Sequence, residues 1–232
     1  MGKIGLHLST STVNCSVAVS VGEEITCCVE ESEDRLVHAE KLHVFIEKAI
    51  ADSGFTTSDL DYLSVDIGPG SYTGLRIGVS AVKGLAYALQ IPIVSMTSPE
   101  ILMAGWTQQF PDQQNATVLA MIDARRMEVY HQFGDAQGSP LDDIQATVLS
   151  EDTFSEERAA NRVYLVGDST EKALTVWNEG ENLISTDILY PSASFMAKRA
   201  LEKYEGSDFV DTAYFEPFYL KDFVAGKPKK LL

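Results

Sequence analysis

The sequence predicts an α/β protein of two lobes, each built on a mixed β-sheet flanked by helices. The first hundred residues are typical of three consecutive strands followed by alternating helices and strands, which favours such a sheet. The second half repeats a coarse version of this element order, without a residue-level repeat. Hydrophobic residues make up 45% of the 232 residues, enough for one core or two.

Hydrophobic periodicity and turn residues place the individual elements. In the first half, strands are predicted at 3–8, 13–21, 25–31, 61–67 and 91–95, and helices at 35–53 and 74–89. In the second half, strands are predicted at 116–123, 127–133, 146–149 and 163–166, and helices at 169–178 and 191–205, the last opened by Pro191.

A connecting helix that starts at Ser98-Pro99 sets the boundary between the lobes near residue 100. We therefore expect an N-terminal lobe at 1–100 and a smaller C-terminal lobe at 101–232, whose last segment can pack back on the first lobe. The polar tail 221–232 is expected to be loosely held.

The charge of the chain limits its partners. Its 18 basic and 34 acidic residues give a net charge of −16, which repels phosphate at long range. The chain alone is thus a poor candidate for binding tRNA, DNA or a membrane, and a basic partner surface is the natural complement. The three cysteines form no disulfide framework or zinc quartet, and neither a signal peptide nor a long apolar segment is recognisable, so we expect a cytoplasmic protein.

The sharpest local feature is the segment 68–78, GPGSYTGLRIG, which predicts a strand end, a glycine-rich turn and a helix start. Ser71 or Thr73 can cap the helix. Free backbone N–H groups at such a start can hold a phosphate or carboxylate, which makes Gly68, Gly70, Ser71 and Thr73 a candidate anion or nucleotide site. A tight turn that needs glycine for its dihedral angles explains the segment equally simply, and on physical grounds we favour it. The segment is not a P-loop, since no Gly-Lys-Ser/Thr follows.

Two predicted helices have faces whose residues suggest contact with another helix or sheet. The helix at 35–53 has its main apolar face around Leu42 and places Val37 and Val44 almost opposite. The helix at 74–89 carries a row of small residues, and each interior glycine costs about 1 kcal/mol relative to alanine, so close packing should compensate. These faces either pack on the chain's own sheet or pair with helices of another subunit, and the residues leave both open.

Few residues indicate catalysis. His38 and His43 are five apart on a helix, so their rings point to different sides, and we predict no metal site and interpret both as surface or interface residues. His7 and His131 are interpreted as packed strand residues. Ser71 and Thr73 have no base at a suitable spacing, so no catalytic residue is predicted. Asp123, Arg125 and Arg126 are interpreted as a polar hairpin turn.

As a string, the segment 68–78 resembles the GPGSFTGLRIG motif of the TsaB (YeaZ) family, with Tyr72 in place of Phe. The order and spacing of further segments also resemble that family. These segments are STST at 9–12, CSVA at 15–18, HAEKL at 38–42, KGLA at 83–86, IDARRMEVY at 122–130 and EPFYLK at 216–221.

The resemblance implies two lobes of the actin/Hsp70/sugar-kinase class, also called ribonuclease H-like. Members of the family pair with a catalytic paralogue, TsaD, and an ATPase, TsaE, in transferring a threonylcarbamoyl group to N6 of adenosine 37 in tRNAs that read codons starting with A. The TsaB subunit is regarded as a scaffold without catalytic activity, so tRNA would be contacted only indirectly. ATP or ADP binding is conceivable in the complex, but no tightly bound cofactor is expected in this chain.

In the family the two long helices build a shared bundle with TsaD, or a homodimer when TsaD is absent. The resemblance therefore assigns a contact surface to both helices. Its expected residues are Val37, His38, Leu42, Val44, Gly74, Gly78, Ala81, Leu85 and Ala88.

One departure concerns the cleft. The family's first strand ends in Asp, which in nucleotide-binding relatives orients a hydrated Mg²⁺, whereas this chain has Ser9. A neutral hydroxyl does not supply the anionic oxygen that Mg²⁺ prefers, so Ser9 is only a weak addition to the candidate nucleotide site. An ATP-dependent phosphotransferase of the same fold and an M22-type peptidase are the alternatives. Ser9 and the missing P-loop disfavour the first, and the lack of HExxH or a nucleophile–base pair disfavours the second.

Overall fold

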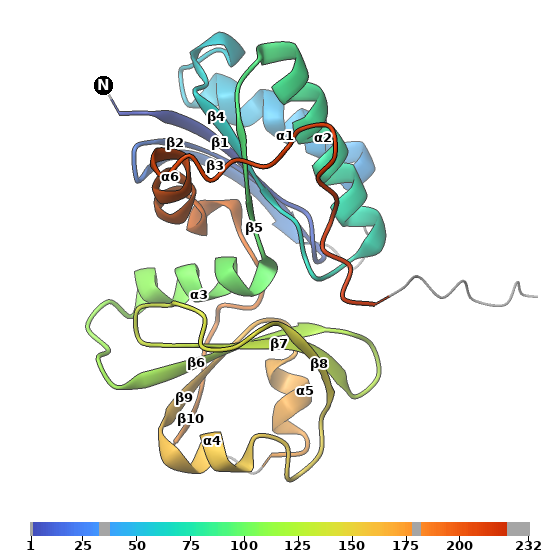
Figure 1. Ribbon diagram of the computed structural model, residues 1–232, viewed down its shortest axis with the longest axis vertical. Helices are drawn as coiled ribbons and strands as arrows, with labels where there is room; N and C mark the ends of the chain where they lie inside the picture. Colours follow the sequence, from blue (N-terminus) through green and yellow to red (C-terminus); the bar gives the residue numbers. More distant parts are fainter. Residues whose placement is uncertain (1, 33–37, 178–181, 222–232) are drawn as a thin grey trace, which may run out of the picture.

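The first lobe contains a five-stranded mixed sheet in the computed structural model, which describes residues 2–32, 38–177 and 182–221 (Figure 1). Its strands lie in the order β3-β2-β1-β4-β5. The first three are antiparallel neighbours, and β4 and β5 continue the sheet parallel to β1. The bounds are β1 (Ile4–Ser9), β2 (Asn14–Val21), β3 (Glu24–Ser32), β4 (Tyr62–Asp66) and β5 (Ile93–Met96).

The second lobe repeats this topology. Its sheet has the order β10-β9-β6-β7-β8, with antiparallel pairs β6–β7 and β7–β8 and parallel pairs β6–β9 and β9–β10. The bounds are β6 (Ala116–Asp123), β7 (Glu128–Gly134), β8 (Gln145–Val148), β9 (Arg162–Val166) and β10 (Leu183–Ser185). The predicted pair of mixed sheets with an echoed element order is confirmed.

Helices cover both faces of the first sheet. On one face, α1 (His38–Asp52) and α2 (Tyr72–Leu89) pack over a core that includes Leu42, Val65 and Val79. On the other face lie the short 3-10 turn η2 (Ala193–Phe195) and α6 (Ala197–Glu205), where Tyr204 stacks on Tyr62 of β4 at 4.7 Å between ring centroids. The helices α1 and α2 are therefore held by the sheet beneath them.

The helix α3 (Ser98–Gln109) lies between the two lobes (Figure 1). Its Ile101 joins the core under the first sheet, whereas Leu102 and Trp106 join the core of the second lobe. The predicted connecting helix is therefore present, and it belongs to both cores because its side chains are buried on two sides.

Several predicted elements need correction. The predicted helix 191–205 is divided, because Ser192 caps the separate turn η2 by accepting a hydrogen bond from Ser194 N at 3.2 Å. The helix α5 (Thr170–Leu174) is shorter than predicted. The helix α4 (Ser155–Ala160), the short 3-10 turn η1 (Thr57–Asp59) and β10 were not predicted, because each is brief and carries little hydrophobic periodicity.

The segment 206–221 returns to the first lobe and then reaches the second. Val210 N donates to the carbonyl oxygen of Ile93 at 3.0 Å, and Phe218 N donates to that of Ile67 at 2.7 Å. Beyond α2, the segment descends to the second lobe, where Lys221 forms an ion pair with Glu128 of β7 (Figure 1). The segment therefore ties the edge of the first sheet to the β6–β7 hairpin.

Some expectations fall on residues outside the described ranges. These are the acidic start of the first long helix at 33–34, Val37, and the tail beyond Lys221. In the part of the chain that is described, no helix combines the length and apolar character needed to cross a membrane.

Candidate functional site

A fully buried carboxylate, Asp66, lies where β4 ends, next to the cleft-facing end of β1. Its Oδ2 accepts hydrogen bonds from the hydroxyls of Ser9 at 2.8 Å and Ser11 at 2.5 Å. Its Oδ1 accepts from the hydroxyl of Ser98 at 2.6 Å and from Gly68 N at 2.9 Å. One carboxylate thus joins the end of β1, the loop after it, the glycine-rich turn and the start of α3.

Burial raises the pKa of Asp66, against the four hydrogen bonds, which lower it. Asp66 was not among the predicted site residues, although an Asp at the end of a predicted strand, two residues before Gly68, was a visible signal. Because donors surround both oxygens, Asp66 is poorly placed to bind a metal ion. Among the described residues no group of three or more His, Cys, Asp or Glu side chains could hold one.

The glycine-rich turn packs on the loop after β1. Ser71 N donates to the carbonyl oxygen of Ser11 at 2.6 Å, and the Thr10 hydroxyl donates to the carbonyl oxygen of Gly74 at 2.8 Å. A Cβ atom on Gly70 would lie 2.2 Å from Ser11 O, and one on Gly74 would lie 2.1 Å from Thr10 O. The glycines therefore permit a close approach between two backbones of this chain.

Much of the predicted anion site is occupied by hydrogen bonds and packing contacts within the chain. Ser71 is the N-cap of α2 and accepts from Gly74 N at 3.2 Å, so the predicted capping role is confirmed. Thr73 is exposed on the first turn of α2. Gly68 adopts a φ of 101°, which a residue with a side chain rarely adopts. The dihedral requirement and the close packing explain this segment without a bound anion.

The pocket beside β2 and β3, at the junction with the second lobe, is acidic. It has a volume of about 340 Å³ and is lined in part by Glu30, Glu31 and Asp187. The Glu30 carboxylate accepts hydrogen bonds from Ser16 at 2.8 Å and Ser192 at 2.6 Å. Carboxylates at this position oppose the binding of nucleotide phosphates.

The structure corrects the interpretation of His38 as a surface residue. The ring is buried, and its Nε2 lies 2.8 Å from the carbonyl oxygen of Thr12, to which it donates. Burial lowers the pKa of His38. The ring also contacts the position where a Cβ on Gly74 would lie, 3.0 Å from its Cδ2. His38 therefore supports the loop after β1 from within the chain.

The predicted contact surface divides into buried and exposed parts. His38, Leu42, Gly74 and Gly78 pack inside the chain, so they are not available to a partner. The remaining described residues of this surface lie at or near the outside of the first lobe. Val44 and Ala88 are exposed, and Ala81 and Leu85 line an open groove.

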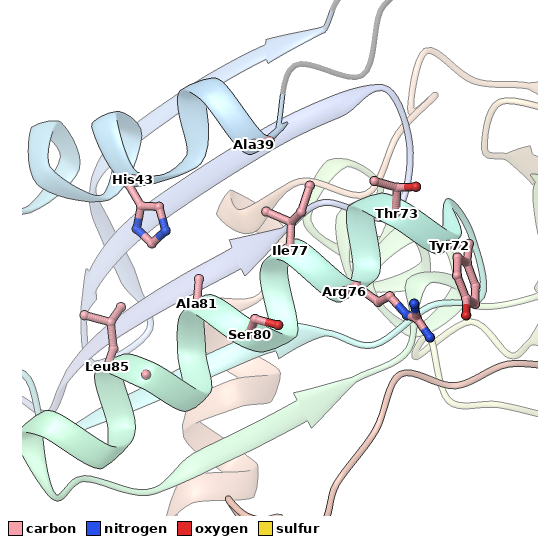
Figure 2. A pocket seen from close by; sticks show the side chains of 10 residues that line it. Ala39, His43, Tyr72, Thr73, Arg76, Ile77, Ser80, Ala81 and Leu85 are labelled. Atoms are coloured by element: carbon pink, nitrogen blue, oxygen red, sulfur yellow. The ribbon is translucent and has the colours of Figure 1, made fainter.

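This groove runs between α1 and α2 on the outer face of the first lobe and has a volume of about 690 Å³. Figure 2 shows the His43 ring of α1 directed toward α2, while Ile77, Ala81 and Leu85 of α2 face α1. Tyr72 and Arg76 close the end near the start of α2 (Figure 2). Gly84 also lines the groove, and a Cβ added there would meet no atom within 4 Å. The surface of the groove is therefore mainly apolar, and the described residues leave it uncovered.

The same strand order occurs in two mixed sheets, each packed against helices, with a cleft between the lobes. This arrangement defines a two-lobed protein of the actin-like, ribonuclease H-like class. Known proteins share this arrangement along nearly the whole chain. The tRNA threonylcarbamoyladenosine biosynthesis protein TsaB of Haemophilus influenzae is 31% identical over 231 residues, which cover 96% of this chain and 95% of that protein. The protein of the same name from Escherichia coli K12 is 27% identical and is covered to 96%.

Solved structures and a family model agree with these relatives. A solved structure named "YeaZ from Pseudomonas aeruginosa" superposes with a TM-score of 0.78 at 26% identity, covering 94% of this chain and 100% of that one. The family model described as "TsaD: tRNA N6-adenosine threonylcarbamoyltransferase" matches residues 35–153. The chain therefore belongs to the TsaB (YeaZ) family.

Proposed function

We propose that the chain is a non-catalytic scaffold subunit for threonylcarbamoyl transfer to N6 of adenosine 37 in tRNAs that read codons starting with A. It acts with a catalytic TsaD subunit and a TsaE ATPase in the cytoplasm. The observation that carries the proposal is the largely apolar groove between α1 and α2, which the described residues leave uncovered. An exposed apolar groove of this kind is typical of a protein–protein contact.

The TsaD-type family model supports a partner of related fold. Its match over residues 35–153 includes α1 and α2, the two helices that flank the groove. A TsaD-type subunit would then present an equivalent helix pair, and two equivalent pairs can pack against each other with approximate two-fold symmetry. The same geometry allows a homodimer when the partner is absent.

The cleft supports a non-catalytic role. Asp66 is saturated by four donors from its own chain, and the pocket at the lobe junction is lined by carboxylates. We therefore propose that this chain holds neither ATP nor ADP tightly and that the partner subunits supply the nucleotide chemistry. The His7 ring lies within hydrogen-bonding distance of the hydroxyls of Ser64 and Ser20, but all three residues are fully buried, so this pairing does not favour a phosphotransferase or a peptidase.

A single charge in the groove tests the docking surface. Ala81 is 7% exposed and belongs to the chain's own core, so Ala81→Glu would also disturb folding. Gly84→Glu instead projects a carboxylate into the open groove. Burying an unpaired charge at an interface costs about 3–5 kcal/mol, so we expect affinity for the TsaD-type subunit to fall at least about a hundredfold.

The measurement is co-purification with the TsaD-type subunit of the source cell, with light scattering to separate homodimer from heterodimer. Ala159→Glu on the exposed side of α4 is the matched control and should retain the partner. The thermal midpoint of Gly84→Glu should equal or exceed that of the unaltered chain, since a helix-interior glycine is removed. Partner recovery at the unaltered level with Gly84→Glu would refute this docking model.

A further inference from the structure

The β6–β7 turn carries two guanidinium groups that have no partner among the described residues. Across the described residues, nearly every Lys or Arg side chain forms an ion pair, hydrogen bond or ring contact with another part of the chain. The side chains that form none within these ranges are those of Arg125, Arg126, Arg162 and Lys198. Two of them are adjacent and exposed, in a chain whose net charge is −16.

The backbone at these two residues is unusual. Arg125 has a φ of 73° and Arg126 a φ of 53°, in the left-handed region that favours Gly or Asn. The turn is fixed by Arg125 N, which donates to Asp123 Oδ1 at 2.9 Å, and by Glu128 N, which donates to Arg125 O at 3.1 Å. Arginine therefore occupies two positions whose backbone conformation suits Gly or Asn better.

Neighbouring carboxylates do not cancel these charges, because lysines already neutralise them. Lys172 of α5 forms an ion pair with Asp123, and Lys221 forms one with Glu128. The turn therefore keeps a local positive charge although the chain as a whole is acidic.

Cationic side chains interleaved with tyrosine rings connect this turn to α2. Lys221 lies 6.0 Å from the centroid of the Tyr130 ring, and Tyr219 packs against Tyr72 with 5.0 Å between ring centroids. Arg76 donates through Nε to the Tyr219 hydroxyl at 3.2 Å. We name this surface the basic strip. Its residues are Tyr72, Arg76, Tyr219, Lys221, Arg125 and Arg126.

Cations interleaved with aromatic side chains are the typical composition of a surface that binds the backbone and bases of a nucleic acid.

We propose that the basic strip binds the phosphate backbone of a folded RNA, which under the proposed function is the substrate tRNA. The inference rests on that function and goes beyond the indirect contact expected from the resemblance. Tyr72 and Arg76 also line the groove, so a partner docked there would bring its own surface beside the strip. The RNA-binding surface is thus composite, and the partner offsets the repulsion from this acidic chain.

The test measures binding of an unmodified tRNA transcript to the complex with the TsaD-type subunit, by fluorescence anisotropy at several salt concentrations. The variant is Arg125→Asn/Arg126→Asn, because Asn tolerates the left-handed backbone and keeps the turn. We expect about tenfold weaker binding and a slope of log affinity against log salt that is smaller by about 1.5, as for the loss of two phosphate contacts. Arg162→Asn, which removes an unpaired arginine from the start of β9, should leave both unchanged.

Each outcome decides between this inference and the proposed function. If a fully assembled Arg125→Asn/Arg126→Asn complex binds tRNA with unchanged affinity and unchanged salt slope, the basic strip does not bind RNA. A second result would also overturn the inference: the variant assembles poorly with the TsaD-type subunit, yet binds tRNA normally once that subunit is present at saturating concentration. The turn would then contact the partner protein and not the RNA. If the unaltered chain forms no complex with the TsaD-type subunit, the docking model fails. RNA binding by the basic strip is then tested by the same tRNA titration at low salt, comparing the unaltered chain alone with the variant chain alone.

Discussion

The Ser9 hydroxyl donates a 2.8 Å hydrogen bond to Oδ2 of Asp66, so the carboxylate at this end of the sheet belongs to β4. In the family pattern given above, the position of Ser9 holds an Asp, so there the carboxylate belongs to the first strand. The two strands are parallel neighbours, so a carboxylate on either can reach the same donors.

We predict that Ser9→Asp lowers the free energy of unfolding by about 3 kcal/mol, because two carboxylates would share one buried site. Ser9→Asp/Asp66→Ser should recover at least half of this loss, since one carboxylate and one hydroxyl are again present. Urea unfolding at pH 7 of both single variants and the double variant measures the coupling. Additive losses would show that Asp66 does not take the place of the strand-end Asp of the family.

Glycines along α2 should differ sharply in their response to alanine. Gly74→Ala places a Cβ 2.1 Å from the carbonyl oxygen of Thr10, a backbone atom that moves only with its loop. We expect it to lower the free energy of unfolding by about 1–3 kcal/mol. Gly84→Ala meets no atom within 4 Å and should raise it by about 0.5–1 kcal/mol. Equal effects in urea titrations would contradict the packing of α2 described above.

Asp168 should make stability depend on pH. Its burial, followed by the charge of Asp123, raises the pKa from 3.8 to about 6, against hydrogen bonds that lower it. The folded state therefore binds this proton more tightly, so the ionised carboxylate destabilises the fold above pH 6 and is harmless below pH 4.

Asp168→Asn keeps an oxygen for the hydrogen bond from Asp123 N and removes the charge. We expect the variant to be more stable at pH 7 by up to about 3 kcal/mol, with the gain shrinking between pH 6 and pH 4. Thermal unfolding across this range measures it. A gain that is constant with pH would show that ionisation of Asp168 is not its cause.

Sequence patterns predicted much of the fold because the long elements carry strong signals. The strands around Val17 and Val65 and the helix around Leu42 bury their hydrophobic residues as their spacing indicates. Short elements such as α4 and β10 were not predicted, because their formation depends on contacts with residues far away in the sequence. The turn η2 shows such a contact, because Ser192 at its start donates a hydrogen bond to the Glu30 carboxylate of β3.

The candidate site was less predictable. Gly74 and Gly78 indicated close packing, but a helix pattern does not show which chain supplies the packed atoms, and here the loop around Thr10 does so. His38 likewise appeared exposed because its buried partner is the carbonyl oxygen of Thr12, a backbone atom without any sequence signal. The groove itself remains a predicted contact surface, now defined by lining residues that the rest of the described chain leaves uncovered.

The return of α6 and the segment 206–221 makes the first lobe discontinuous along the chain. During synthesis, β1 to β5 emerge well before the residues that cover their second face, whereas the strands of the second lobe emerge together. A lobe whose pieces are that far apart completes its core only late in translation. Until then Tyr62 and Val94 lack their covering side chains, so the nascent first lobe displays an apolar surface that chaperones can recognise.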